Sequence, residues 1–171
     1  MSRFDLHPEL LTAEAFAEFG DVMTRDTAEQ RVINDGTTTR YHDLAKIDVA
    51  DEDGCAIVNV FHGIGVELPL RLRLMERHPI GSQAFWPLSD EPFLIVVAPA
   101  GPAPGLDDLR AFHVPAGTGV NYAKGVWHHP LISAYVASDF LVIDRGGDGD
   151  NLDEVQFSDD LDVILHGYKT V

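Results

Sequence analysis

Two histidine-bearing stretches carry most of the chemistry that this sequence could direct into an apolar interior. The first runs Glu76-Arg77-His78-Pro79 and is followed by Gln83, and the second runs Val126-Trp127-His128-His129-Pro130. Imidazole nitrogens and carboxylates bind divalent metal ions, and the same groups serve as general acids and bases. The two stretches therefore predict a metal site or an acid/base site, provided that the fold brings them together.

Leucines alternate with arginines just before the first stretch. This alternation predicts a strand over residues 68–76 that turns its leucines inward and Arg71 and Arg73 outward. Glu76 and His78 continue the leucine parity, so we expect both side chains to point into the core. A buried charge is costly there unless it meets a metal ion, a ligand or a hydrogen-bonding partner.

The remaining segments predict the elements that must position these side chains. Thr12 precedes a helix-like segment, residues 13–19, which ends at Gly20. Beyond it, short apolar runs separated by Gly- and Pro-rich turns predict strands over residues 56–61, 68–76, 83–86, 93–97, 110–114, 126–131, 135–136 and 140–144. Many short strands of this kind are typical of antiparallel sandwiches and barrels, so we predict a mainly β fold with a short N-terminal helix.

Length and composition limit the possible classes of protein. The 171 residues, 45% of them hydrophobic, fit a single domain over residues 1–171. A formal net charge of -16 argues against a nucleic-acid partner, because phosphate binding needs an excess of Lys and Arg. We expect no membrane partner, since no apolar window is long enough and the N-terminus lacks a signal-peptide core. The lone Cys55 suits a reducing compartment, which predicts a cytoplasmic protein.

The spacing of the polar residues resembles the two motifs of the cupin barrels. Glu76-x-His78-x4-Gln83 is similar to the first motif, with Glu in place of a histidine and Gln in place of a glutamate. Ala123-Lys124-Gly125-Val126-Trp127-His128 is similar to the second, with Ala in place of Pro. The resemblance implies a metal held by His78, Gln83 and His128, although an amide is a poorer ligand than a carboxylate.

Six blocks of sequence resemble the signatures of the ureidoglycolate lyase family. In chain order they are Arg40-Tyr41-His42-Asp43, Glu76-Arg77-His78-Pro79, Gln83-Ala84-Phe85-x-Pro87-Leu88, Gly119-Val120-Asn121-Tyr122, Val126-Trp127-His128-His129-Pro130-Leu131 and Asp139-Phe140-Leu141-x-Ile143-Asp144-Arg145-Gly146-Gly147. The resemblance spans nearly the whole chain. It implies a cupin-like antiparallel β-barrel, a homodimer, and cleavage of ureidoglycolate to glyoxylate and urea in purine (allantoin) degradation. It also implies a divalent ion such as Ni²⁺ and no organic cofactor.

This reaction assigns tasks to particular side chains. Cleavage of a carbinolamide needs a base for the hydroxyl proton and an acid for the departing urea nitrogen. The candidates for these catalytic roles are Glu76, His78, His128 and Asp144. The candidates for substrate binding are Arg40 and His42 at the carboxylate, Gln83 and Asn121 at the ureido amide, and Lys124 at a substrate oxygen.

Each of these assignments has a structural alternative. A histidine such as His78 or His128 can be a hydrogen-bonded core residue, Arg40 can belong to a salt-bridged surface turn, and Lys124 can lie in solvent. His129 has the opposite parity to His128, so we expect it to face outward or toward an interface.

Two other functions stay open for a cupin-like fold, because this fold hosts many unrelated activities. One is a metal-dependent oxygenase or isomerase, which metal analysis and oxygen uptake would reveal. The other is a non-catalytic small-molecule-binding protein, which would bind glyoxylate or ureidoglycolate without turnover.

Overall fold

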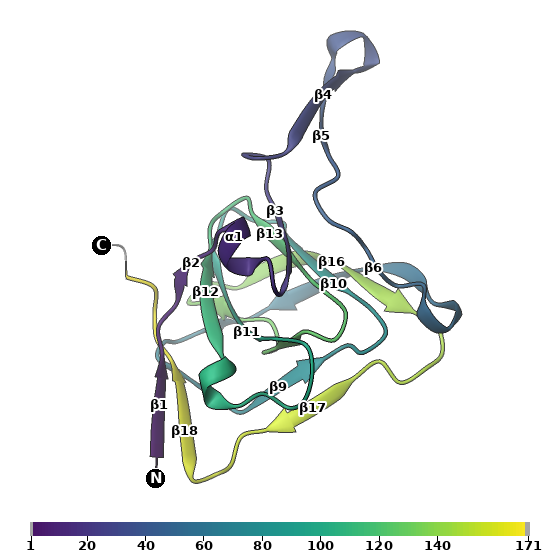
Figure 1. Cartoon of the computed structure of the whole chain (residues 1–171). Coiled ribbons are helices and arrows are strands. Elements are labelled where there is room, and N and C mark those ends of the chain that lie inside the picture. The colour runs from purple at the N-terminus through teal and green to yellow at the C-terminus, as the bar shows by residue number, and fades with distance from the viewer. Residues whose placement is uncertain (1, 170–171) are drawn as a thin grey trace.

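The computed structural model describes residues 2–169, and these are built mainly of strands (Figure 1). In chain order the elements are β1 (Ser2–Leu6), β2 (Glu9–Leu10), α1 (Ala13–Phe16), β3 (Gly20–Met23), β4 (Glu29–Ile33), η1 (Asn34–Gly36), β5 (Thr38–His42), η2 (Asp51–Asp53), β6 (Cys55–Gly63), β7 (Gly65–Val66), β8 (Leu70–Leu72), β9 (Leu74–Arg77), β10 (Gln83–Pro87), β11 (Phe93–Ala98), η3 (Leu106–Asp108), β12 (Arg110–Val114), β13 (Gly119–Tyr122), β14 (Trp127–His128), β15 (Ser133–Ala134), β16 (Ser138–Gly146), β17 (Asp153–Gln156) and β18 (Leu161–Leu165). The two largest sheets have the orders β3-β13-β10-β16-β6 and β17-β9-β14-β11-β12-β2. The predicted mainly β, cupin-like fold class is confirmed.

The core is divided into two clusters by the central strand β11, all of whose residues are buried. Its odd-numbered residues pack toward the five-stranded sheet, in a cluster that includes Phe85, Val120 and Phe140. Its even-numbered residues pack on the other side with Leu72 and Val163, which belong to the three-stranded sheet β1-β18-β8. The sequence of β11 is therefore continuously apolar rather than alternating, because both faces of the strand are covered.

The predicted N-terminal helix is present as α1. The Thr12 hydroxyl accepts a hydrogen bond from the Ala15 amide at 3.1 Å, which caps the helix. The helix ends at Phe16, earlier than predicted, and the chain then turns into β3 at Gly20. A side chain could not replace this glycine, since a Cβ there would lie 1.9 Å from the Asn121 carbonyl oxygen. Among residues 2–169, no helix has the length and apolar character that crossing a membrane would require.

The strand predicted over residues 68–76 is broken into β8 and β9. Leu72 and Met75 both pack in the second cluster although they are three residues apart, so the parity changes at the break near Arg73. Glu76 consequently does not share the face of Leu72, as the simple alternation predicted. It still points to an interior, because the opposite face of β9 borders a cavity.

Two other predicted strands are shorter or displaced. The segment 126–131 forms only the two-residue strand β14, which stops before Pro130. The strand predicted at residues 135–136 is β15, two residues earlier. Tyr135 has φ of 65°, which lies outside the β region and ends that strand.

A hairpin made of β4 and β5 projects away from the sheets as an arm (Figure 1). The two strands pair only with each other, with Arg31 directly opposite Arg40. Every residue of β4 is exposed. The two strands of the arm thus pair with no other strand of the described chain.

Candidate active site

Strands β9 and β14 bring the two histidine-bearing stretches together. Glu76 and His128 stand directly opposite each other in this antiparallel pair, so they share a face. The Gly125 amide donates to the His78 carbonyl at 2.9 Å, which ties the second stretch to the first. As a result, ligand atoms of Glu76, His78 and His128 all lie within 4.8 Å of one another.

Backbone carbonyls orient both histidine rings. Nδ1 of His78 lies 2.7 Å from the Asn151 carbonyl oxygen, and Nδ1 of His128 lies 3.1 Å from that of Val126. A carbonyl oxygen only accepts, so each Nδ1 carries a proton and donates it. Nε2 of each ring is buried without a hydrogen-bonding partner in the described chain. The two Nε2 atoms are thereby left free to act at the cluster.

Gln83 is oriented in a similar way by Asp144. The Gln83 amide nitrogen donates to one Asp144 oxygen at 2.7 Å, and the Asn59 amide nitrogen donates to the other at 2.9 Å. This arrangement leaves Oε1 of Gln83 buried and without a partner among the described residues. Asp144 thus lies behind Gln83 and is absent from the cavity lining.

The cluster contains more acceptors than donors. Oε1 of Glu76 is 3.6 Å from Nε2 of His128, and two acceptors this close repel unless a cation lies between them. A proton on Nε2 of His128 would supply such a cation, because the ring, already protonated at Nδ1, would become an imidazolium. Burial raises the pKa of Glu76, but the neighbouring His128, together with His78 and His129, outweighs burial and holds that pKa below its usual value. A divalent metal ion could replace the proton, because imidazole nitrogens, a carboxylate and an amide oxygen fit such an ion.

The cluster borders a cavity of about 550 Å³, a size suited to a small molecule. Tyr122 stacks on His128 inside it, with ring centroids 4.3 Å apart and planes 12° from parallel. Burial and the charge of Glu76 both raise the pKa of Tyr122, so its hydroxyl remains protonated. The walls are largely apolar, and the lining contains no lysine or arginine: Phe61, His62, Gly63, Ile64, Val66, Glu76, Gln83, Phe85, Phe93, Leu94, Ile95, Tyr122, His128, His129, Pro130 and Leu131.

Asn121 lies on the other side of its strand from this cavity. Its amide nitrogen donates to the Asp21 carboxylate and to the Lys46 carbonyl, both at 3.0 Å. The neighbouring Tyr122 reaches the cavity instead, and sequence reasoning missed it. Strand parity could have revealed it. Tyr122 lies two residues after the buried Val120 and so shares its face, whereas Asn121 lies on the opposite face.

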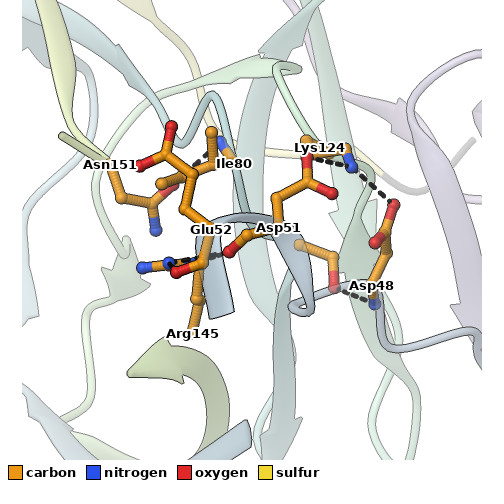
Figure 2. Close-up of polar contacts among 8 residues, drawn as sticks. Asp48, Asp51, Glu52, Ile80, Lys124, Arg145 and Asn151 are labelled. Carbon is orange, nitrogen blue, oxygen red and sulfur yellow. Dashed lines mark hydrogen bonds and ion pairs between the residues drawn. The ribbon is translucent and has the colours of Figure 1, made fainter. Parts of the chain in front are cut away.

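Lys124 and Arg145 hold a segment of chain beside the site (Figure 2). Nζ of Lys124 lies 2.7 Å from the Asp51 carboxylate and 3.1 Å from that of Asp48. The buried Arg145 guanidinium donates to the backbone carbonyls of Asp51 and Glu52. In this structure both cations are therefore engaged with the segment 48–52, and neither lines the cavity.

Asn151 is a second residue that sequence reasoning missed. Its carbonyl oxygen accepts from His78, and its side-chain oxygen accepts from the Ile80 amide at 3.0 Å (Figure 2). It therefore fixes both the ring of His78 and the turn that follows. No sequence pattern could have revealed it, because Asn151 is 73 residues from His78 and acts partly through its backbone.

Three further residues that the sequence singled out lie in different places relative to the cavity. Arg40 is on the exposed part of the arm and His42 is half-buried at its base, so neither lines the cavity of its own chain. His129 was expected to face outward or toward an interface, and it lines the cavity. The simple parity argument failed because β14 ends at His128, and strand alternation does not extend past its end.

Comparison with known proteins identifies the family of this chain. The family model described as ureidoglycolate lyase matches residues 3–164. A ureidoglycolate lyase of Burkholderia mallei is 56% identical over 153 residues, covering 90% of this chain and 89% of the relative. Ureidoglycolate lyases of Pseudomonas entomophila and Pseudomonas paraeruginosa are 48% and 50% identical, covering 94% and 92% of this chain and 96% and 93% of the relatives. The chain belongs to the ureidoglycolate lyase family.

Proposed function

We propose that this chain cleaves ureidoglycolate to glyoxylate and urea. The family supplies the reaction, and one structural observation carries the mechanism: Glu76 and His128 line a small cavity, and His78 lies beside them without lining it. The surrounding wall is apolar and holds a protonated tyrosine, which suits a small polar substrate that must be oriented by few contacts.

Glu76 and His128 have complementary parts in the mechanism. The carboxylate of Glu76 takes the proton of the substrate hydroxyl, and the carbon–oxygen double bond of glyoxylate forms as the carbon–nitrogen bond breaks. His128 gives its Nε2 proton to the departing nitrogen, which completes urea. The proton on Glu76 then returns to His128 across the 3.6 Å that separates them. No water is consumed, and both groups end as they began.

The products distinguish this reaction from its alternatives. Purified protein given ureidoglycolate should release glyoxylate and urea in equal amounts, without ammonia, because only the carbon–nitrogen bond of the carbinolamide breaks. Enzymatic assays of all three compounds in one sample would test this. Ammonia as the main nitrogen product would instead indicate an amidohydrolase, and stoichiometric oxygen uptake would indicate an oxygenase.

We also propose that a divalent ion, with Ni²⁺ as the first candidate from the family resemblance, can occupy the cluster in place of the Nε2 proton of His128. His78, Gln83 and His128 would hold it through the three buried atoms that have no partner in the described chain, with Glu76 beside them. Such an ion would supply a Lewis acid that polarises the substrate hydroxyl or carboxylate. Asn151 and Asp144 would orient its ligands.

We also propose a homodimer and a cytoplasmic location. Val58 and Val60 of β6 are 65% and 62% exposed, and the strand register places them beside Ile143 and Leu141 on the outer face of the five-stranded sheet. A contiguous apolar face of this kind supports association with a second copy. Light scattering should give twice the chain mass of 18.8 kDa. A monomer mass at working concentrations would refute the dimer.

The single cysteine supports the proposed cytoplasmic location, because a reducing compartment suits a free thiol.

A further inference from the structure

The projecting arm of β4 and β5 is incomplete as an element of a single chain. A two-stranded hairpin that packs on nothing else is marginally stable in water. This arm pairs only with itself, and its outer end exposes apolar side chains, with Val32 69% and Ile33 38% exposed. Burying these side chains against another surface would stabilise the arm.

The arm also carries one arginine side chain that has no partner. Arg31 and Arg40 are directly opposite in the hairpin, an arrangement that like charges disfavour. Arg31 is neutralised by Glu29, 2.8 Å away. The Arg40 side chain makes no hydrogen bond or ion pair with any residue from 2 to 169, so its guanidinium is available for an external anion.

The cavity lacks the kind of positively charged side chain that the arm carries. Its lining includes the charged Glu76 but no lysine or arginine, whereas ureidoglycolate carries a carboxylate. A guanidinium matches a carboxylate with two parallel hydrogen bonds. The rim of the cavity is apolar as well, since Ile64 lines it and is 72% exposed. The cavity thus lacks a cation and an apolar cover, and the arm offers both.

We propose that the arm of each chain crosses to a second copy and completes its active site. Ile33, which shares a hairpin face with Arg40, covers the apolar rim beside the partner's cavity, and Arg40 binds the carboxylate of the substrate held there. This inference rests on the proposed lyase function and on the homodimer, and it makes the active site a shared one. It also explains why Arg40 is absent from the cavity of its own chain.

A heterodimer with one defect in each chain tests the proposal directly. Chains carrying Arg40→Ala and His128→Ala would be coexpressed with two different tags, and the mixed dimer purified by both tags in turn. If each site combines His128 of one chain with Arg40 of the other, one cavity of the heterodimer contains both substitutions and the other cavity contains neither. The heterodimer should therefore show about half of the wild-type activity per dimer, while each parent homodimer stays far below it.

The other outcomes overturn the proposal. A heterodimer no more active than its parents would show that Arg40 serves its own chain or no site, and failure to isolate any mixed dimer would show that the chains do not pair. Arg40→Ala alone should lower kcat/KM by roughly 10- to 100-fold, mainly through KM, because a charged hydrogen bond is lost. An unchanged KM in that variant would also contradict it.

A matched control separates charge from folding. Arg31→Ala changes the residue opposite Arg40 in the same hairpin, but this arginine is already paired with Glu29. It should keep a KM close to wild type, and Arg40→Lys should recover part of the affinity. Release of glyoxylate and urea by the wild-type protein tests the lyase function separately, so failure of the shared site would leave that function intact.

Discussion

Replacing His128 with alanine should lower kcat by roughly two to four orders of magnitude, the usual worth of a general acid or base. The expected loss is large because this one ring supplies the proton for the leaving nitrogen and also keeps Glu76 ionised. Initial rates of glyoxylate release at saturating ureidoglycolate would measure it. Wild-type turnover in this variant would remove His128 from the mechanism.

The chain offers a close structural control for this truncation. His113 stacks on Tyr168 with ring centroids 4.2 Å apart and planes at 12°, nearly the geometry of His128 on Tyr122. It does not line the cavity. His113→Ala should therefore lose a similar stacking contact and leave kcat almost unchanged. Thermal unfolding of both variants would show whether loss of activity in His128→Ala reflects chemistry or stability.

The sequence predicted the strands better than it predicted which side chains reach the cavity, because Glu76, Gln83 and His128 line it and Asp144, Asn121 and Lys124 do not. Periodicity identified most of the strands and the capped helix, because alternation and turn chemistry are local properties. It misplaced the face of Leu72 relative to Glu76, since a break of one residue between β8 and β9 reverses the parity and leaves no mark in composition. His129 was misplaced for a related reason, at the end of a two-residue strand.

Contacts between distant segments could not be predicted in the same way. The spacing of the motifs indicated that Glu76, Gln83 and His128 share an interior, and all three line one cavity. The spacing did not indicate that the Asn151 carbonyl orients His78, because that contact depends on how a loop folds back. Arg40 raises a further difficulty, since a site completed by a second chain leaves no trace in the topology of one chain.

Metal binding provides the second large effect. The wild-type protein should bind Ni²⁺ weakly enough to lose it on dialysis against a mild chelator, because an amide oxygen of Gln83 stands where a stronger ligand would hold the ion. His78→Ala should weaken binding by more than about 10-fold, since it removes a nitrogen ligand outright. Calorimetric titration with Ni²⁺, supported by elemental analysis after dialysis, would measure both.

The same titration decides between the two cations that can occupy the cluster. If Ni²⁺ displaces a proton from His128, binding should release protons, and the measured heat should change with the ionisation enthalpy of the buffer. His113→Ala should bind as the wild type does, since that ring lies outside the cavity. A stoichiometric ion that resists chelation would show that Glu76 completes a strong site. Full activity with no bound ion would assign the chemistry to the proton shared by Glu76 and His128, whose atoms are already 3.6 Å apart.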